Sequence, residues 1–542
     1  MLLKGADIII KVLMEQGCDT VFGYPGVQII DVYESLYKYS DSIRHILTAH
    51  EQGAVHAADG FARSSGKPGV VIATSGPGAT NLVTGIATAY MDSVPLVLVT
   101  GNVARDQIGT DSFQEIDITG ITLPITKHNY FVDDGNALAD TVREAFVIAS
   151  SGRPGPVLID VPKDIQEGMF EYEEQPAQVR ETLQSAKEQR IKKAAERINK
   201  AKRPYIYFGG GIVSSGAEEE LKALAEKTDA PMGCSMMGLS AIPTDYPGFL
   251  GMQGVHGRYA STRAMQRADL IIALGVRFND RATGEKFEYV KGADIVHIDI
   301  EGAEISKNTV DKFGMRGDLK LTLSEMMKHL RDSSRPEWKD EVAGYLKEEA
   351  ESADTRPGFT PRNIIEEING ILDDDTPVVT DVGQHQVWAA QYIRLKKGRR
   401  FITSGGLGTM GFGLGAAIGS EIATGTRPVL LTGDGSFGMN LNELATAVKY
   451  EIPVTAVLFN NSALGMVRQW QDMYFEGHHS CTDLDRKTDF VALAEAFGAA
   501  GERVDSLEGL ASALEKAGGC KGPYLIECVI DSDEKVSPGM PG

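Results

Sequence analysis

The chain has 542 residues, of which 42% are hydrophobic and 24% are charged, and this balance excludes a disordered chain and a coiled coil. At about 150 residues per domain, the length predicts three or four domains. Aspartate and glutamate number 75 against 54 lysines and arginines. The resulting formal charge of −21 argues against a nucleic-acid or anionic-membrane partner.

Cysteine usage and the N-terminal residues indicate the compartment. Five cysteines without a CxxC pair are typical of free thiols in a reducing environment. No apolar run reaches the roughly 18 residues of a membrane helix. Asp7 and Lys11 interrupt the only apolar stretch near the N-terminus, which is not the pattern of a signal peptide. We therefore expect a cytoplasmic protein.

Short apolar runs alternate with helical stretches along the whole chain, which predicts parallel strands covered on both faces and an α/β fold. The runs cover 69–74, 95–100, 156–161, 204–208, 270–274, 294–299, 427–432 and 453–459. Two polar segments, 166–190 and 329–361, have the composition of linkers, and we expect no strand in the first. They divide the chain into three doubly wound parallel-sheet domains, 1–165, 190–330 and 360–542.

The first and last thirds of the chain resemble each other. Shifting the sequence by 358 residues aligns seven identities, without a gap, in the 29 positions 71–99. Both copies read strand, glycine-rich turn, helix, proline and strand. Any two βαβ units share part of this pattern, but the conserved spacing favours a duplication. We therefore expect related folds at the two ends of the chain.

Two polar motifs follow neighbouring strands of the last third. Gly433-Asp434-Gly435 follows the strand at 427–432, a helix is expected over 438–450, and Asn460-Asn461 follows the next strand. The carboxyl ends of parallel strands are where ligands bind in open sheets. Carboxylate and amide oxygens suit Mg²⁺, and glycines let backbone N–H groups approach a phosphate. A plain Asp-Gly turn is the alternative, and the paired Asn-Asn disfavours it.

A GDG motif followed after about 25 residues by NN resembles the cofactor signature of thiamine-diphosphate enzymes. The resemblance implies that Asp434, Asn461 and the carbonyl of Ala463 hold Mg²⁺. It also implies that Glu51 hydrogen-bonds the aminopyrimidine ring and that Met410 supports the bent cofactor. In this family the two repeat units meet across a subunit interface, so the resemblance implies a dimer. The alternatives are a helix-capping role for Glu51 and core filling for Met410.

The loop at 404–411 indicates an alternative function. Its Gly406-x-Gly408-x-x-Gly411 pattern matches a dinucleotide-binding fingerprint, which would indicate a nicotinamide dehydrogenase. That reading leaves the pairing of Asp434 with Asn461 unexplained.

Longer segments of the sequence resemble one particular group of thiamine-diphosphate enzymes. Residues 50–63, 74–81 (TSGPGATN), 111–117 (DSFQEID), 151–163 and 465–471 (GMVRQWQ) look like the catalytic subunit of acetohydroxyacid synthase, over about 1–530. This family decarboxylates pyruvate and joins the two-carbon unit to pyruvate or 2-oxobutanoate, giving 2-acetolactate or 2-aceto-2-hydroxybutanoate for branched-chain amino-acid synthesis. The resemblance further implies FAD, a homodimer or homotetramer, and a regulatory small subunit as a partner.

The resemblance implies roles for residues in all three domains. The catalytic residues are Glu51, Gln114, Lys127 and Met410. The thiamine-diphosphate residues are Pro25, Gly26, Thr74, Gly76, Asn81, Gln384, His385, Gly408, Met410, Gly433, Gly435, Ser436 and Met466. The FAD residues of a Rossmann-like middle domain are Gly209, Gly210, Gly211, Met252, Arg277, Asp280 and Asp299. The substrate residues are Phe113, Gln114, Lys127, Arg277, Val467 and Trp470. For a single lysine or arginine, a solvated surface charge is the common alternative.

The chain departs from the family pattern at Val27, Asn102 and Gly415, and it ends at Gly542, before the tail that helps close the site in the family. We expect these changes to affect substrate preference and turnover more than the fold. Other thiamine enzymes remain alternatives, namely a catabolic acetolactate synthase, a pyruvate oxidase or a 2-oxo acid decarboxylase. A non-catalytic binding relative is a further alternative, which the retained Glu51 and Asp434 disfavour.

Overall fold

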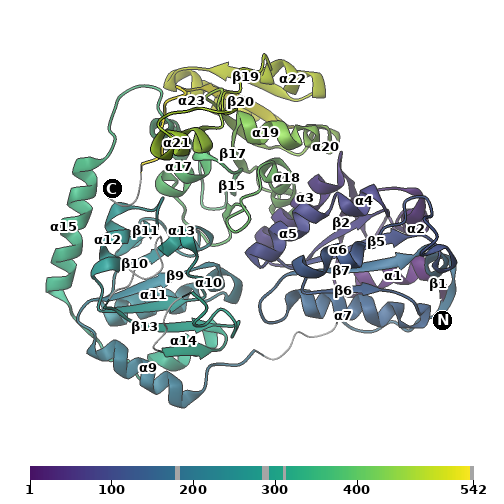
Figure 1. The fold of residues 1–542 in the computed structure, drawn as a ribbon, viewed down its shortest axis with the longest axis horizontal. Helices are drawn as coiled ribbons and strands as arrows, with labels where there is room; N and C mark the ends of the chain where they lie inside the picture. The colour runs from purple at the N-terminus through teal and green to yellow at the C-terminus, as the bar shows by residue number, and fades with distance from the viewer. Residues whose placement is uncertain (178–182, 284–291, 309–312, 538–542) are drawn as a thin grey trace.

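The computed structural model describes residues 1–177, 183–283, 292–308 and 313–537. It contains three six-stranded sheets in which every described pairing is parallel, and each sheet belongs to one third of the chain (Figure 1). All eight predicted apolar runs are strands, with ends within two residues of those expected. The five cysteines are free. No helix among the described residues is long and apolar enough to cross a bilayer.

The N-terminal domain has the sheet order β3-β2-β4-β5-β7-β6. Its strands are β2 (Thr20–Tyr24), β3 (Arg44–Leu47), β4 (Gly69–Ala73), β5 (Leu96–Asn102), β6 (His128–Phe131) and β7 (Pro156–Pro162). Its helices are α1 (Gly5–Glu15), α2 (Ile30–Lys38), α3 (Glu51–Ser65), α4 (Pro77–Thr80), α5 (Val83–Asp92), α6 (Ile118–Thr122), α7 (Leu138–Ser150) and α8 (Lys163–Glu167). They cover both faces of the sheet, as its continuous apolar strands require.

The C-terminal domain has the sheet order β16-β15-β17-β18-β20-β19. Its strands are β15 (Val378–Thr380), β16 (Phe401–Ile402), β17 (Val429–Gly433), β18 (Thr455–Asn460), β19 (Ala500–Val504) and β20 (Tyr524–Val529). Its helices are α16 (Pro361–Asn369), α17 (Gln384–Tyr392), α18 (Phe412–Thr424), α19 (Asp434–Asn440), α20 (Leu444–Lys449), α21 (Gly465–Tyr474), α22 (Phe490–Phe497) and α23 (Leu507–Gly519). Numbered within each domain, both orders read 2-1-3-4-6-5, in agreement with the expected relationship between the two ends.

The middle domain has a different sheet order, β11-β10-β9-β12-β13-β14, which reads 3-2-1-4-5-6. Its strands are β9 (Pro204–Phe208), β10 (Met232–Cys234), β11 (Phe249–Met252), β12 (Leu270–Leu274), β13 (Asp294–Asp299) and β14 (Phe313–Arg316). Its helices are α9 (Glu188–Lys200), α10 (Gly210–Ser215), α11 (Glu218–Thr228), α12 (Tyr259–Arg267), α13 (Asp280–Thr283) and α14 (Leu319–Met327).

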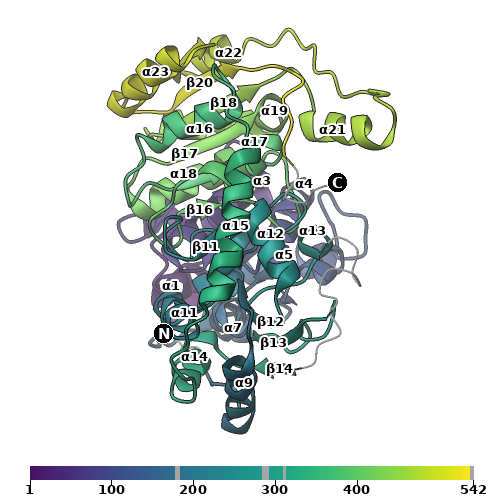
Figure 2. The same ribbon diagram turned by 90° about the vertical axis from the view of Figure 1, so that its left-hand side faces the viewer.

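Two local expectations, for the segments 166–190 and 438–450, differ from the structure. The segment 166–190 does contain a strand, β8 (Met169–Glu171), which pairs antiparallel with β1 (Leu2–Lys4). The segment 329–361 contains α15 (Pro336–Ser352), which runs along the margin of the molecule in Figure 1 and in front of the middle domain in Figure 2, and buries Trp338. The helix expected over 438–450 begins at Asp434 and is divided by a 3₁₀ turn at 441–443.

The N- and C-terminal domains contact each other mainly through α3 and α18 (Figure 1). Glycines bring the two helix backbones together, because a Cβ atom on Gly60 or Gly419 would overlap a carbonyl oxygen of the facing helix. A Cβ atom on Gly415 would lie 2.8 Å from Cβ of His56. The departure at Gly415 therefore suits this close packing, and the interface fixes the start of α3 relative to the C-terminal sheet.

Candidate active site

A cleft lies at the carboxyl ends of β17 and β18, which pair in parallel. Eleven of the residues with predicted roles line it, namely Gln384, His385, Met410, Gly433, Asp434, Gly435, Ser436, Asn461, Ala463, Met466 and Val467. All the residues that line this cleft come from the C-terminal domain. The structure thus brings the C-terminal group of predicted residues together in one place.

Asp434 is the first residue of α19, and burial raises the pKa of its carboxyl to about 6. Asn461 is also buried, and its side chain donates to Oε1 of Gln384 at 3.3 Å. No group of three His, Cys, Asp or Glu side chains among the described residues could hold a metal. The predicted donors, one carboxylate with an amide and a backbone carbonyl, nonetheless fit Mg²⁺, which takes further oxygens from water or phosphate.

His385 lies beside the GDG turn. Its buried Nε2 atom has no hydrogen-bond partner among the described residues, and burial lowers the pKa of the ring to about 3. A Cβ atom on Gly433 would lie 3.0 Å from Nδ1 of His385, so glycine leaves the space between them open. Ser436 donates to the carbonyl of Val382 at 2.7 Å. An unpartnered polar atom in a cleft of this kind fits a ligand that carries oxygen atoms, such as a diphosphate.

The position of Met410 depends on a residue that the sequence did not single out. Asp381 is buried and accepts from the N–H of Gly411 at 2.8 Å and from Oγ1 of Thr432 at 3.2 Å. Burial raises the pKa of its carboxyl to about 6. These bonds fix the turn between Met410 and α18, in which Gly411 has φ +87°. The available signal was the position of Asp381 directly after β15, which parallels Asp434 after β17.

The loop at 404–411 does not behave as a dinucleotide-binding turn. The carboxylate of Asp92 accepts from the N–H groups of Gly405 at 3.0 Å and Gly406 at 2.7 Å. Backbone donors that already bind a carboxylate are not free to bind a pyrophosphate. This contact disfavours the nicotinamide reading. Gly408 has φ +72° and does not line the cleft around Asp434.

A second group of predicted residues gathers in the N-terminal domain around Glu51. Nδ2 of Asn81 donates to Oε2 of Glu51 at 3.0 Å. Gly26 lies against Thr74, whose buried Oγ1 has no hydrogen-bond partner among the described residues. Two further predicted residues, Gly76 and Gln114, contact each other there, and both have positive φ. Pro25 precedes Gly26 at the end of β2.

Glu443, from the C-terminal domain, positions the start of α3. Its fully buried carboxylate accepts from the N–H groups of Ala49 at 3.2 Å and His50 at 3.0 Å, directly before Glu51. Burial raises the pKa of this carboxyl. A Cβ atom on Gly53 would overlap it. No sequence pattern indicates Glu443, because its partners lie almost 400 residues away along the chain.

The two groups of predicted residues are separate within one chain. Glu51 adjoins Glu443, whereas Asp434 stands at the other end of α19 and its 3₁₀ turn. The seven residues of α19 at about 1.5 Å each and the three residues of the 3₁₀ turn at about 2 Å each span on the order of 15 Å. We call these two groups the Glu51 half-site, in the N-terminal domain, and the Asp434 half-site, in the C-terminal domain.

The predicted substrate residues are dispersed. Phe113 is 81% exposed, and Trp470 faces Tyr474 with ring centroids 5.1 Å apart. The ammonium group of Lys127 binds backbone carbonyls at the end of α7, including that of Ser151 at 2.6 Å. Such contacts do not support a substrate role for Lys127.

Arg277 contacts the backbone of the N-terminal domain. Its guanidinium group donates to the carbonyl of Met91 at 2.7 Å, at the boundary between the middle and N-terminal domains. Arg281 instead lies over the ring of Trp470, 5.1 Å from its centroid. Arg281 is therefore the arginine that accompanies Trp470, and the sequence analysis gave it no substrate role.

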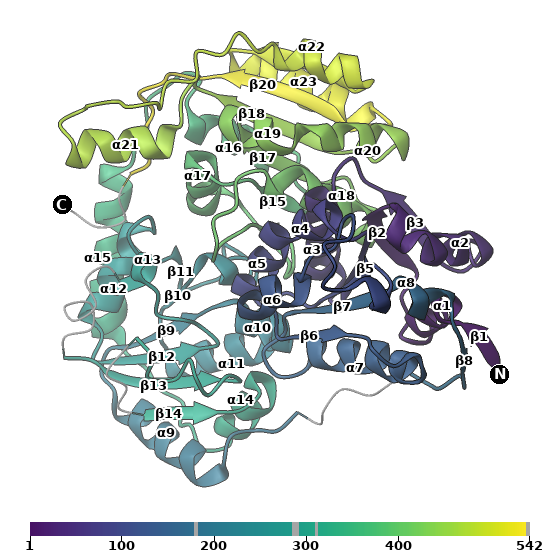
Figure 3. The same cartoon turned by 45° about the vertical axis from the view of Figure 1, so that its right-hand side comes forward.

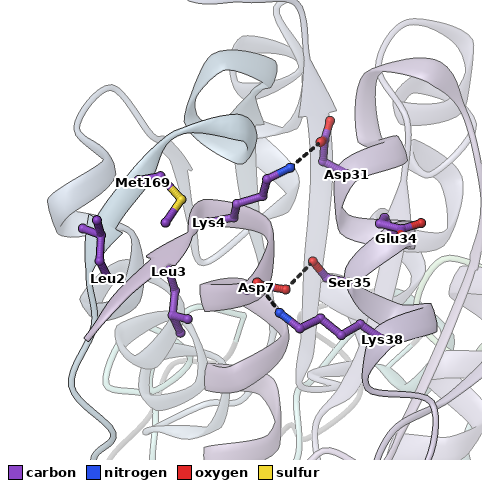
Figure 4. Close-up of a pocket in the computed structure, with 9 residues that line it drawn as sticks. All are labelled: Leu2, Leu3, Lys4, Asp7, Asp31, Glu34, Ser35, Lys38 and Met169. Atoms are coloured by element: carbon purple, nitrogen blue, oxygen red, sulfur yellow. Dashed lines mark hydrogen bonds and ion pairs between the residues drawn. The ribbon is translucent and has the colours of Figure 1, made fainter.

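A further cleft lies between α1, α2 and the β1–β8 pair (Figure 4). Asp7 accepts from Ser35 at 2.9 Å and from Lys38 at 2.7 Å, and Lys4 lies 4.0 Å from Asp31. These polar groups bind one another, and none of the residues with predicted roles lines this cleft.

Comparisons with known proteins agree with this arrangement. Three family models match in order: the N-terminal TPP binding domain of thiamine pyrophosphate enzymes over residues 3–121, their central domain over 191–326 and their C-terminal TPP binding domain over 381–528. The probable acetolactate synthase large subunit of Methanocaldococcus jannaschii is 43% identical, over 100% of this chain and 94% of its own length. The chain belongs to the thiamine pyrophosphate enzymes, within the acetolactate synthase large-subunit family.

Other relatives of this family are similarly close. The acetolactate synthase of Mycobacterium bovis is 43% identical, over 99% of this chain and 89% of its own length. The isozyme 3 large subunit of acetolactate synthase from Escherichia coli is 41% identical, over 99% of this chain and 96% of its own length. The recognition made from the GDG, TSGPGATN and GMVRQWQ motifs is thereby confirmed.

The middle domain of this family member uses its predicted FAD glycines partly for packing. Gly211 donates to the carbonyl of Gly275 at 3.1 Å, and Gly209 donates to that of Leu274. Cβ atoms on Gly209 or Gly211 would press against Gly275, so glycine lets the ends of β9 and β12 approach each other. The other predicted FAD residues vary in burial, since Met252 and Asp299 are buried, Gly210 is partly buried and Asp280 is exposed.

Two departures from the family pattern have local explanations. Val27 is 64% exposed in the turn after Gly26, beside the Glu51 half-site. Asn102 is buried and donates to Oδ2 of Asp160 at 2.6 Å, where burial raises the pKa of that carboxyl to about 7. Asn102 therefore has a structural role at the end of β5, whereas Val27 faces outward from the half-site.

Proposed function

We propose that this chain is the catalytic subunit of an acetohydroxyacid synthase. It decarboxylates pyruvate and joins the two-carbon unit to pyruvate or 2-oxobutanoate. The observation that carries the proposal is the combination of full-length similarity to acetolactate synthases with two half-sites built from the expected residues.

Thiamine diphosphate and Mg²⁺ fit the residues of the Asp434 half-site. Asp434, Asn461 and the carbonyl of Ala463 would hold the metal, and His385 offers its unpartnered Nε2 to the diphosphate. When bound, the cofactor supplies the electron sink that decarboxylation of a 2-oxo acid requires. Met410, Leu464 and Val467 line the same cleft with apolar groups that would exclude water.

Glu51 is proposed to exchange a proton with the pyrimidine end of the cofactor. Its Oε2 atom is held by Asn81, and Glu443 fixes the backbone before it, so the carboxyl group is oriented before any ligand binds. A preoriented acid–base group of this kind typically contributes about 10²- to 10⁴-fold to a rate.

We infer that a complete site requires a second copy of the chain, because the cleft at Asp434 is lined by residues of the C-terminal domain and Glu51 is not among them. Exposed apolar side chains near the two half-sites, including Val27, Phe113 and Met439, support contact with another subunit. We therefore propose a homodimer as the smallest active unit, and a homotetramer would be two such dimers. The relatives from M. jannaschii and E. coli are named large subunits, which supports a regulatory small subunit as a partner.

FAD is proposed for the middle domain. Strand order reverses between β9 and β12, and nucleotides bind at the carboxyl ends of such strands in doubly wound folds. The glycine turn at 209–211 and Gly275 lie at these strand ends, and the buried Asp299 ends β13. A yellow protein whose released chromophore has the absorption spectrum of FAD would support this assignment, and a colourless protein that does not bind added FAD would reject it.

The direct test of the proposed function is product analysis. The purified protein is incubated with pyruvate, thiamine diphosphate, Mg²⁺ and FAD, with and without 2-oxobutanoate. We expect 2-acetolactate from pyruvate alone and a shift to 2-aceto-2-hydroxybutanoate when 2-oxobutanoate is present. Acetaldehyde as the main product would instead indicate a decarboxylase, and oxygen consumption with peroxide would indicate an oxidase.

A further inference from the structure

The helix α21, which carries Met466, Val467 and Trp470, packs little of its surface against the protein core. Gln469 is the only buried residue of its ten, and Val467, Met473 and Tyr474 are all more than half exposed. Figure 3 shows α21 at the margin of the C-terminal domain, away from the sheet. Since helices in proteins are stabilised mostly by burying an apolar face, the position of α21 must depend on other contacts.

The side-chain amide of Gln469 forms two hydrogen bonds with the backbone of Val536. Its Oε1 accepts from the N–H of Val536 at 2.9 Å, and its Nε2 donates to the carbonyl of Val536 at 2.9 Å. Oε1 also accepts from Nε2 of Gln384 at 3.1 Å. The reversed amide would set an NH₂ group against two donors, so these partners fix its orientation.

The same hydrogen bonds reach the predicted metal-binding residue Asn461. Gln384 accepts from Nδ2 of Asn461 at 3.3 Å and donates to the carbonyl of Glu534 at 2.8 Å. A Cβ atom on Gly465, the first residue of α21, would overlap the amide of Gln384. Asn461, Gln384, Gln469 and Val536 are all buried and form one continuous chain of hydrogen bonds.

We propose that Gln469 is a positioning residue for the second substrate. By binding the backbone of Val536, it holds α21, and with it Trp470, in a fixed position relative to Asn461. Gln469 acts through the helix and contacts neither the reacting atoms nor the cofactor. The inference rests on the proposed function, because it assigns the choice of the second 2-oxo acid to the placement of α21.

The test variant is Gln469→Glu, which keeps the shape of the side chain but replaces the donor to Val536 with an acceptor. In the full chain with thiamine diphosphate, Mg²⁺ and FAD bound, we expect hydrogen exchange of residues 465–475 to become about tenfold faster. We also expect the KM for 2-oxobutanoate to rise about tenfold more than kcat falls. The matched control is Gln391→Glu, which loses a donor from α17 to the carbonyls of Ser537 and His256. This control should leave both quantities unchanged.

A second variant that ends at Lys535 removes the partner of Gln469. Its effect on α21 exchange should match that of Gln469→Glu, and combining the two changes should add little, because both break the same contact. Any of four results would overturn the proposal. The first two are unchanged hydrogen exchange of α21 and additive effects of the two changes on that exchange. The others are an unchanged KM for 2-oxobutanoate and an effect of Gln391→Glu equal to that of Gln469→Glu. Exchange needs no turnover, so a chain that forms no acetohydroxy acid would refute the proposed function and still leave the exchange test decisive for the anchoring of α21.

Discussion

Replacing Glu51 with glutamine should lower the rate of acetohydroxy acid formation by about 10²- to 10⁴-fold. Glutamine keeps the shape of the side chain and can still bind Asn81, which lies 3.0 Å away, but it cannot exchange a proton at neutral pH. The loss should therefore appear in kcat for pyruvate. The measurement is initial-rate kinetics with saturating thiamine diphosphate and Mg²⁺.

The matched control for this substitution is Glu495→Gln, at an exposed position on α22. It should leave turnover unchanged. Thermal unfolding should give the same midpoint for wild type and both variants, because Glu51 is only partly buried. Turnover of Glu51→Gln close to that of wild type would remove Glu51 from the mechanism.

Replacing Asp434 with alanine should weaken metal-dependent binding of thiamine diphosphate by at least about 100-fold, since loss of outer-shell partners alone typically costs about 10- to 100-fold. Asp434 is the single carboxylate of the predicted metal set, so its loss leaves only neutral oxygens. Calorimetric titration with thiamine diphosphate in the presence and absence of Mg²⁺ measures the effect. Asp505→Ala, at an exposed position before α23, is the control. An unchanged affinity in Asp434→Ala would reject this metal site.

The strands and the GDG turn were predictable because their signals are local. A run such as 270–274 is apolar at every position, and such a run can only be a buried strand or part of a buried helix. Flanking turn residues and the regular alternation with helices resolve that ambiguity. Asp434 and Asn461 follow two such strands, so their proximity follows from the parallel order of the sheet.

The residues that orient the half-sites were not predictable in the same way. Glu443 binds the backbone before Glu51, and Gln469 binds Val536, across separations of 393 and 67 residues. A lone glutamate or glutamine on a helix has no local signal of burial, and the sequence pattern treats both as surface residues. Asp381 could have been predicted as a site residue, because it directly follows a short β-branched strand.

Lys127 and Arg277 illustrate the opposite difficulty. Each long cation can reach many acceptors, and both donate to backbone carbonyls in this structure, so their substrate roles stay predictions. For the same reason, the sequence did not indicate the contact of Arg281 with the ring of Trp470. The strand in the segment 166–190 was not predicted for a different reason. β8 is only three residues long and takes its register from β1 at the other end of the domain.

The central claim is that Glu51 of one chain and Asp434 of another build one acetohydroxyacid synthase site. It is tested by co-producing Glu51→Gln and Asp434→Ala chains with different affinity tags and purifying the mixed dimer. One of its two sites would contain both intact residues, so the account predicts about half the wild-type rate of 2-acetolactate formation per dimer. A mixed dimer no more active than either parent variant would contradict the account, because it would mean that each site is completed within a single chain.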